Sequence, residues 1–494
     1  LHSDGYWITY GKADFGTGSE TVEFNAAAIA DGGGLIELHD GIADGPILGT
    51  VEITPTGDWK TRQTFTAKIK KTSGVKMLTI VLRSKTAGET NNRTKVEGGN
   101  TTIYARFPGI KDPNDGSVEV CARATVFTPA KPNINYITVR GFDIRNVATN
   151  WAAPTTGQQG AVTAYWNKGW IIEDNEISYS RCCGIALGKY SEEWHDKSIA
   201  PHDYTRLVIE AYDLASWNKA TIGSHLVRNN KIHHCGQTGI VGSLGCAFSR
   251  IIGNEIHDTN RQGIWGGAEM AGIKFHGAID TVIADNHIHH CGDLGGLWLD
   301  WMAQGTIVTG NLFHDNPQDL FTEVNHGPFL VANNLFLSGV MQKNGWGGSQ
   351  GGAYAHNFIT GSIVRFYPDG RKTPVFKPHS TDGNTDRGNP VGDVRWYNNL
   401  LAGRANTACH DSASLPCAYG GNVFTKGTVQ SKFEKEFLAK PEFDTGAKLI
   451  QKPDGWYLQL KTDAAWASEQ KRKLVTTQLL GKAVVPDQAF ENPN

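Results

Sequence analysis

Two carboxylates, Asp300 and Glu323, have the residue type and the spacing that acid–base or nucleophilic chemistry requires. Each ends a short, mainly apolar run, Leu-Trp-Leu-Asp or Leu-Phe-Thr-Glu. If the segment from position 300 to position 323 forms one coil of a parallel β-helix, the two side chains share one register on strands about 4.8 Å apart. Carboxyl groups about 5–5.5 Å apart are typical of retaining glycosidases, in which one attacks the sugar and the other acts as acid and then base.

Aromatic and polar residues surround this pair when the coils are aligned. Aligning the Gly-apolar pairs at 263–264 and 296–297 places Trp265 and Trp298 on the outward side with the carboxylates, because strand side chains alternate between faces. Outward aromatic rings suit a sugar platform and are costly on bare surface. Glu269, further along the same outward row, is expected to bind a sugar hydroxyl without joining the chemistry. The substrate-binding residues predicted in this way are Trp265, Trp298, Glu269, Lys274, His276, Asn325 and His326.

Plainer interpretations of these residues are also open. Outward carboxylates on a solenoid are commonly solvated surface groups, and the N-terminal domain could cover the tryptophan row. A polysaccharide lyase on the same fold would use an Arg or Lys base with Ca²⁺, whereas a non-catalytic, tailspike-like solenoid would use the pair only as ligand contacts. Because a lyase favours a strongly basic groove, the outward carboxylates and tryptophans favour a glycosidase.

A phrase of the form apolar-x-Asn-x-apolar recurs between residues 118 and 425 and predicts the element that positions the pair. From position 230 onward its asparagines are Asn230, Asn254, Asn286, Asn311, Asn334, Asn357 and Asn399. A period of about 23 residues, with longer intervals absorbed by loop insertions, is typical of a right-handed parallel β-helix in which the asparagines stack along one turn. The Leu-x-x-Leu-x-Leu frame of a leucine-rich repeat is absent. An insertion at 188–223 contains a helical stretch, Trp194 and Trp217. It is expected either to cover the substrate cleft beside the carboxylates or to pack on the flank of the β-helix.

Residues 1–117 alternate short apolar–polar strands with Gly, Asp and Pro turns, which predicts an antiparallel sandwich. The order of its strands resembles the jelly-roll carbohydrate-binding modules, although whether this one binds a sugar stays open. The predicted fold is therefore all-β, with a jelly roll over 1–117 and a right-handed parallel β-helix over 118–494. The last part of the second domain, from about residue 425, is expected to be a C-terminal extension.

Charge and composition exclude several classes of protein. The 47 Lys and Arg residues balance 49 Asp and Glu residues, so no nucleic-acid partner is expected. No run of 18 apolar residues occurs, so no membrane span is expected either. The first residues show no basic segment followed by an apolar stretch, and this lack of a visible signal peptide favours a cytoplasmic over a secreted protein. The compartment, the segment preceding residue 1, a homo-oligomeric state and a disulfide between Cys409 and Cys417 stay open.

Two signals suggest metal ions but have plainer explanations. The phrase His-His-Cys-Gly occurs at 233–236 and again at 289–292, with a spacing that matches no zinc finger. We interpret it as one turn conformation used in two coils, and we predict no metal site and no cofactor. Asp293, Asp315 and Asp319 could hold a structural Ca²⁺, although surface turn chemistry is the favoured explanation.

Several longer stretches can be compared with a known enzyme family. They are Gly-Leu-Trp-Leu-Asp-Trp-Met-Ala-Gln-Gly-Thr at 296–306, Leu-Phe-Thr-Glu-Val-Asn-His-Gly-Pro at 320–328, Glu-Met-Ala-Gly-Ile-Lys-Phe-His at 269–276 and Val-Thr-Thr-Gln-Leu-Leu-Gly at 475–481. These stretches resemble glycoside hydrolase family 120, whose known members are retaining β-xylosidases, and the resemblance covers nearly the whole chain. It implies that Asp300 is the nucleophile and Glu323 the acid/base, in a β-helix interrupted near its start by a jelly roll. The opening β-helix segment of that family is missing from this sequence.

The expected activity is therefore that of a retaining, exo-acting β-xylosidase. Such an enzyme releases xylose from the non-reducing end of short xylo-oligosaccharides by double displacement, so these oligosaccharides are the expected partner. Another β-helix glycosidase, such as an arabinosidase or a galactosidase, stays open, because one sequence does not reveal the sugar preference of the pocket.

Overall fold

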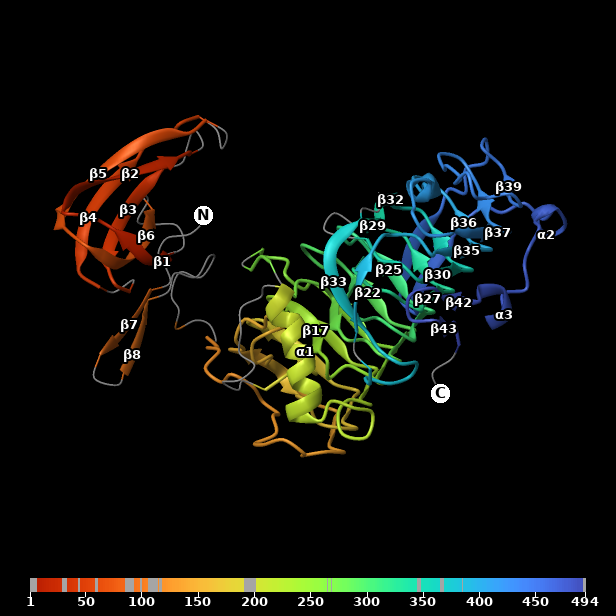
Figure 1. The fold of residues 1–494 in the computed structure, drawn as a ribbon, viewed down its shortest axis with the longest axis horizontal. Coiled ribbons are helices and arrows are strands. Elements are labelled where there is room, and N and C mark those ends of the chain that lie inside the picture. Colours follow the sequence, from red (N-terminus) through yellow and green to blue (C-terminus); the bar gives the residue numbers. More distant parts are fainter. Residues whose placement is uncertain are drawn as a thin grey trace. The chain divides into compact units, whose positions relative to one another are not determined.

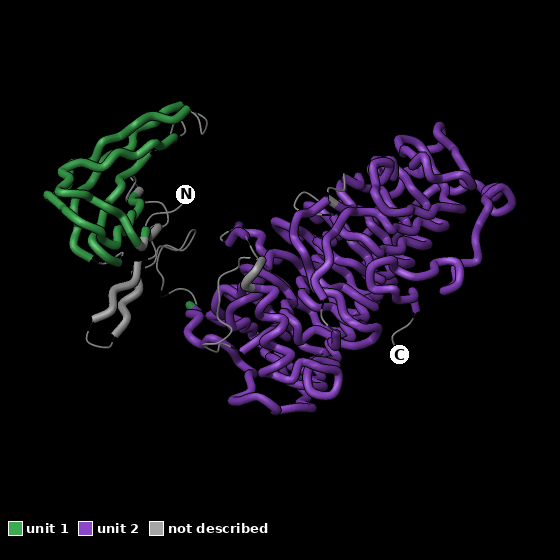
Figure 2. Tube along the Cα trace, viewed as in Figure 1, with its two compact units in different colours: residues 1–118 green, residues 119–494 purple. Residues whose placement is uncertain are grey.

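The chain divides into two structural units, residues 1–118 and residues 119–494 (Figures 1 and 2). The computed structural model describes residues 7–28, 33–42, 45–57, 61–84, 93–97, 100–104, 114, 118–190, 201–263, 265–267, 269–343, 348–364, 368–383 and 385–491. Within these residues most regular structure is β-strand, and none of the helices is long and apolar enough to cross a membrane.

The first unit is an antiparallel, jelly-roll-like sandwich, as predicted. One sheet has the strand order β1-β6-β3-β4-β5-β2, and β7 pairs with β8. Leu38 and Ala67 are fully buried in its apolar cluster, because alternate side chains of each strand face the same side. The strands are β1 (Trp7–Asp14), β2 (Ser19–Ala26), β3 (Gly34–Asp40), β4 (Ile47–Ile53), β5 (Gln63–Thr72), β6 (Val75–Ser84), β7 (Arg93–Glu97) and β8 (Asn100–Tyr104).

The second unit is a right-handed parallel β-helix, also as predicted, and its coils follow one another along the axis in Figure 1. The strands form three parallel sheets, and the functional argument concerns the eight-stranded one. In spatial order this sheet contains β11 (Gly160–Thr163), β14 (Cys183–Ala186), β17 (Thr238–Ser243), β20 (Ile273–His276), β23 (Leu297–Asp300), β26 (Leu320–Glu323), β29 (Val340–Lys343) and β32 (Ser362–Val364).

The other two sheets complete each coil. The eleven-stranded sheet contains β10 (Asp143–Val147), β13 (Glu176–Ser180), β16 (Lys231–His233), β19 (Glu255–His257), β22 (His287–His289), β25 (Leu312–His314), β28 (Leu335–Phe336), β31 (Phe358–Ile359), β36 (Leu400–Leu401), β38 (Val423–Phe424) and β39 (Leu438–Ala439). The ten-stranded sheet contains β37 (Ala418–Gly420), β35 (Arg395–Tyr397), β30 (Gly352–Ala355), β27 (Phe329–Ala332), β24 (Thr306–Thr309), β21 (Val282–Ala284), β18 (Arg250–Ile252), β15 (Leu226–Arg228), β12 (Ile171–Glu173) and β9 (Thr138–Arg140).

Two stacks of side chains hold the coils in register. Inward aliphatic residues, among them Ile240, Ile273 and Leu297, are fully buried and lie opposite one another on successive strands. The predicted asparagine stack is confirmed, because each side-chain amide donates to the next at 2.9–3.0 Å. The stack consists of Asn175, Asn230, Asn254, Asn286, Asn311, Asn334, Asn357, Asn399 and Asn422.

One strand of the eight-stranded sheet begins later than predicted. The sheet uses β20, which pairs with β17 and β23, while residues 263–267 are not part of a described strand. At the start of β20 only glycine fits, because a Cβ on Gly272 would lie 2.7 Å from the carbonyl oxygen of Gly296, whereas a Cβ on Gly263 would meet nothing within 4 Å. The prediction that Trp265 belongs to this sheet is therefore wrong.

Two insertions with regular secondary structure of their own interrupt the coils, and one of them carries α1 (Pro201–Ala215), which lies beside β17 in Figure 1. Leu207 of α1 is fully buried in an apolar cluster that also contains Leu244 and Trp301 from the turns after β17 and β23. Trp217 is buried in the same cluster, whereas Trp194 lies outside the described residues. The described part of this insertion therefore packs on the flank of the β-helix.

The other insertion is the antiparallel hairpin of β33 (Asp369–Val375) and β34 (Thr385–Asn389), and further short elements follow the coils. These are β40 (Lys448–Lys452), β41 (Gly455–Gln459), α2 (Trp466–Glu469), α3 (Thr477–Leu480), β42 (Lys482–Ala483) and β43 (Gln488–Ala489), whereas a 3-10 helix, η2 (Thr407–His410), lies within the coils between β36 and β37. All eight cysteines are free thiols, so Cys409 and Cys417 form no disulfide.

Candidate active site

Asp300 and Glu323 lie directly opposite each other at the ends of β23 and β26. This pairing confirms the predicted register and, at the usual spacing of parallel strands, puts their backbones about 4.8 Å apart. Each residue is 6% exposed, so both carboxyl groups are almost removed from water. In such an environment, neighbouring charges strongly influence which of the two is ionised.

Two cations hold one oxygen of Asp300. Its Oδ2 accepts from Nζ of Lys274 at 2.9 Å and lies 2.9 Å from Nε2 of His276. Burial alone would raise the pKa of Asp300, but the charges of His276 and Lys274 hold it well below its usual range. Among the described residues, Oδ1 of Asp300 has no hydrogen-bond partner. Asp300 is therefore an ionised carboxylate with one oxygen held and the other free.

Lys274 and His276 lie on β20, the strand that pairs with β23 on the side away from β26. Lys274 pairs with Trp298, and His276 pairs with Asp300, so both side chains face the same side as the carboxylates. Neither position was predicted to lie on the strand, because the alignment had used residues 263–267. The long interval between Asn254 and Asn286 contained the signal, since an insertion before the strand moves the strand later.

Glu269 lies behind these two cations in the loop before β20. It is fully buried, with Oε2 2.5 Å from Nζ of Lys274 and Oε1 3.4 Å from Nδ1 of His276. Nε2 of Gln158 donates to the same Oε1 at 3.0 Å. Burial would raise the pKa of Glu269, but the charges of Lys274 and His276 lower it. Glu269 is therefore a second anion that keeps both cations oriented toward Asp300, and its placement on the predicted outward row was wrong.

Glu323 has a different environment from that of its partner. Its Oε1 accepts from Nη2 of Arg371 at 2.6 Å, and Arg371 is itself held by Asp369 through two hydrogen bonds of 2.9 Å. Burial and the negative charge of Asp300 raise the pKa of Glu323 to about 7, although Arg371 acts in the opposite direction. Glu323 is thus partly protonated near neutral pH, whereas Asp300 is ionised.

Arg371 and Asp369 were missed at the level of sequence. They belong to β33, which inserts between Asn357 and Asn399 and accounts for the long interval between these two asparagines. That interval indicates an insertion, but it does not indicate which residues the inserted side chains contact. Tyr204 of α1 was missed for the same reason; its ring centroid lies 4.6 Å from that of His276.

The predicted aromatic row is only partly formed. The ring centroids of Trp298 and Phe321 are 5.1 Å apart, and Nζ of Lys274 lies 4.2 Å from that of Trp298. Trp298 is 6% exposed and Phe321 1% exposed, so the two rings pack in an apolar cluster two positions before the carboxylates on the same two strands. Trp265 lies off the sheet, where its Nε1 donates to the backbone oxygen of Arg181 at 3.1 Å.

Asn325 and His326 make internal contacts. The side chain of Asn325 donates to the backbone oxygen of Leu299 at 2.8 Å and accepts from the backbone nitrogen of Ala303 at 2.7 Å. The two ring nitrogens of His326 lie 2.7 Å from Nε2 of Gln350 and 2.8 Å from Oγ1 of Thr373, and burial lowers its pKa to about 4. Both residues thus support the turn after Glu323, and no described contact joins either of them to the two carboxylates.

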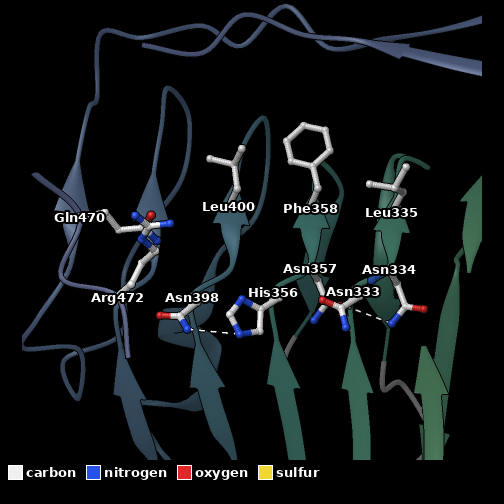
Figure 3. Close-up of a pocket in the computed structure, with 10 residues that line it drawn as sticks. All are labelled: Asn333, Asn334, Leu335, His356, Asn357, Phe358, Asn398, Leu400, Gln470 and Arg472. Atoms are coloured by element: carbon white, nitrogen blue, oxygen red, sulfur yellow. Dashed lines mark hydrogen bonds between the residues drawn. The ribbon is translucent and has the colours of Figure 1, made fainter. Parts of the chain in front are cut away.

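A pocket of about 380 Å³ lies elsewhere on the second unit (Figure 3). Leu335, Phe358 and Leu400 project in the same direction from neighbouring strands, and Nδ2 of Asn398 is 3.4 Å from Nε2 of His356. These residues belong to the eleven-stranded sheet and its preceding turns, not to the sheet that carries the carboxylates. The lining residues are Asn333, Asn334, Leu335, His356, Asn357, Phe358, Asn398, Leu400, Gln470 and Arg472.

Comparison with known families identifies both parts of the fold. Residues 1–125 match the family described as carbohydrate binding module (family 6), and residues 216–360 match the right-handed β-helix region. The chain therefore contains a family 6 carbohydrate-binding module and a right-handed β-helix. A solved structure of XylC in complex with xylose is 29% identical, with a TM-score of 0.76 over 98% of this chain and 82% of that chain.

Two curated relatives match shorter segments. An arabinoxylan arabinofuranohydrolase of Paenibacillus polymyxa is 31% identical over an alignment of 129 positions that covers 23% of this chain and 20% of that protein. An endo-1,4-beta-xylanase A of Thermoclostridium stercorarium is 32% identical over 78 residues, which are 16% of this chain and 15% of that protein. The chain thus spans a fifth or less of the length of these relatives.

Proposed function

We propose that the β-helix unit is a retaining β-xylosidase of glycoside hydrolase family 120, acting from the non-reducing end of short xylo-oligosaccharides. The observation that carries this proposal is the opposite electrostatic environment of two carboxylates in one register. The pKa of Asp300 lies below its usual range, whereas that of Glu323 is raised to about 7. Pairs of carboxyl groups whose environments separate their pKa values are typical of glycosidase acid and nucleophile roles. The likeness to XylC, solved with xylose, supports the choice of sugar.

In the first step, Asp300 attacks the anomeric carbon through its free oxygen, Oδ1. The bond from that carbon to the leaving oxygen breaks, Glu323 gives its proton to the leaving oxygen, and a xylosyl ester of Asp300 forms. Lys274 and His276 hold Oδ2 of Asp300, so the attacking carboxylate keeps its orientation.

In the second step, Glu323 acts as the base. Esterification removes the negative charge of Asp300, and that charge is one cause of the raised pKa of Glu323. The pKa of Glu323 therefore falls once the intermediate has formed, which suits a group that must now accept a proton from water. The water oxygen bonds to the anomeric carbon, the ester bond breaks, and Asp300 returns to its ionised form beside Lys274.

Nucleophile and acid/base variants on nitrophenyl β-xyloside with added azide test these roles. Glu323→Ala should still form the intermediate, because nitrophenolate needs little protonation, and azide should then yield the β-xylosyl azide. Asp300→Gly should show no burst of nitrophenol, and any azide product should have the α configuration. Glu176→Gln, an outward carboxylate on β13, is the matched control and should keep full turnover.

Both carboxylate variants should lose at least about 10³-fold in kcat/KM on xylobiose. Exchange of the two azide products would mean that Asp300 and Glu323 have exchanged roles. Binding of xylobiose without any turnover by the unaltered chain would contradict the enzyme itself and favour a sugar-binding solenoid. A panel of aryl xylosides, arabinosides and galactosides tests the choice of sugar, and a preference for another glycoside would refute that part of the proposal.

A further inference from the structure

We propose that the β-helix carries a Zn²⁺ site on its eleven-stranded sheet, with His287, His289 and His314 as ligands. One ring nitrogen of each of these three histidines lies within 4.8 Å of those of the other two. Neutral imidazole is a preferred ligand of Zn²⁺, and three histidines with a fourth position left for water form a common zinc coordination. The site lies on a different sheet from Asp300 and Glu323, so it is independent of the proposed hydrolase activity.

Two neighbouring strands present the three histidines. His287 and His289 lie two positions apart on β22, so both face the outside of the sheet. His314 lies on β25 directly opposite His289. Ligands on paired strands are held more precisely than ligands on a loop, because the backbone hydrogen bonds of the sheet determine their spacing.

His287 and His314 show the geometry of two converging ligands. Their Nε2 atoms lie 2.7 Å apart, and Nδ1 of His314 lies 2.7 Å from Oδ2 of Asp315. The carboxylate favours a proton on Nδ1 of His314, which leaves the Nε2 lone pair free for a metal, as in the carboxylate–histidine–zinc arrangement. Zn–N bonds of about 2.0–2.1 Å in a tetrahedron separate two nitrogens by about 3.3 Å, so these two rings need to open only slightly.

His289 supplies the third nitrogen. Its Nδ1 lies 2.7 Å from Nδ1 of His290, whereas its buried Nε2 makes no hydrogen bond among the described residues and lies 3.7 Å from Oε1 of Glu255. The side chain is 10% exposed, and the 3.7 Å separation from Glu255 is longer than a hydrogen bond. Its ring lies parallel to that of His314, with centroids 4.7 Å apart, and the broad torsion about the ring bond of histidine allows the rotation that binding requires.

The three ligands belong to a longer row of stacked rings. Imidazoles of successive strands lie 4.7–4.9 Å apart with interplanar angles of 4–11°, in the order His233, His257, His289, His314. Among the strands of this row, only β22 contributes a second outward histidine, His287. We therefore place the site at His287, His289 and His314.

An aromatic ring from the C-terminal part of the chain lies against the same position. The ring centroid of Trp456, on β41, is 4.8 Å from that of His314 and 5.3 Å from that of His287. Metal binding would therefore be coupled to the position of the β40–β41 hairpin. The cysteines of the repeated His-His-Cys-Gly phrase are not ligands, because Cys235 and Cys291 are buried in the core.

Metal titration of the full chain tests the site. After dialysis against EDTA, isothermal titration with Zn²⁺ alone should show one tight equivalent, and Co²⁺ in its place should give the visible absorption of a tetrahedral complex. His287→Ala and His314→Gln should each weaken Zn²⁺ binding more than about 100-fold, and Asp315→Asn about 10-fold, because it only orients a ligand. His233→Ala, at the far end of the row, is the matched control and should bind as the unaltered chain does.

Thermal unfolding separates loss of the site from loss of the fold. Zn²⁺ should raise the unfolding temperature of the unaltered chain, because it binds only the folded state, and should not raise that of His287→Ala. The metal-free variants should keep the circular dichroism of the unaltered chain. Absence of a tight equivalent in the unaltered chain would overturn the proposal. Full Zn²⁺ affinity in His287→Ala with loss in His257→Ala would also overturn it, because His257 belongs to a different group of three with His234 and Asp258.

Discussion

Removal of the positive charge next to Glu323 should extend activity to higher pH. In the proposed reaction Glu323 must be protonated, so kcat/KM falls as the pH rises through its pKa, which is about 7. Nη2 of Arg371 donates to Oε1 of Glu323 at 2.6 Å and stabilises the ionised form. In Arg371→Met that stabilisation is lost, so the pKa of Glu323 rises and the alkaline limb of the profile moves upward.

The structure sets the size of this shift. A hydrogen bond to a charged group is worth about 1.5–3 kcal/mol, and about 1.36 kcal/mol corresponds to one pH unit. The side chain of Arg371 is 25% exposed, so water replaces part of the lost interaction and the lower end of the range applies. We therefore expect the alkaline midpoint to move from about 7 to about 8, by about one pH unit.

The assay is the pH dependence of kcat/KM on xylobiose, whose leaving group needs protonation. Lys372→Met is the matched control, because Lys372 is the next residue on β33 and is exposed. Its profile should coincide with that of the unaltered chain. An alkaline limb of Arg371→Met that stays in place or moves to lower pH would refute the assignment of that limb to Glu323.

Further outcomes test the site and the fold. In Lys274→Met the acidic limb of the same profile should move to higher pH, because Lys274 lowers the pKa of Asp300; an unchanged acidic limb would contradict this. Proton NMR during hydrolysis of a β-xyloside should show β-xylose first, and initial α-xylose would contradict retention. Asn286→Ala should lower the free energy of unfolding, measured in urea, by about 2–4 kcal/mol, because its buried partners in the asparagine stack lose their hydrogen bonds. A loss below about 1 kcal/mol would show that the stack contributes little to stability. Removal of residues 1–118 should leave kcat/KM on xylobiose within about twofold, since these residues form a unit of their own, whereas loss of turnover would tie the site to that unit.

The repeated asparagine phrase made the β-helix predictable. Each copy places one asparagine and the apolar residues around it in the same position of a coil, so a one-dimensional period encodes the stacking of neighbouring strands. The spacing between Asp300 and Glu323 carries the same information, and the structure pairs these residues as expected. One coil contains two Gly-apolar pairs, at 263 and at 272, and the period alone does not show which of them begins the strand. The close packing of Gly272 against Gly296 determines that the strand begins at the second pair.

The sequence by itself therefore determined the fold and the pairing of the two carboxylates, because both follow from a local phrase that recurs at a regular interval. Only the tertiary structure decided the environment of that pair. Arg371 reaches Glu323 from an inserted hairpin, and Glu269 reaches Lys274 from a loop before the strand, at positions that no period predicts. Charges within about 3 Å in a buried site govern which carboxylate is ionised, and the contacts of Glu269 and Arg371 exist only after the loop and the hairpin have packed against the coils.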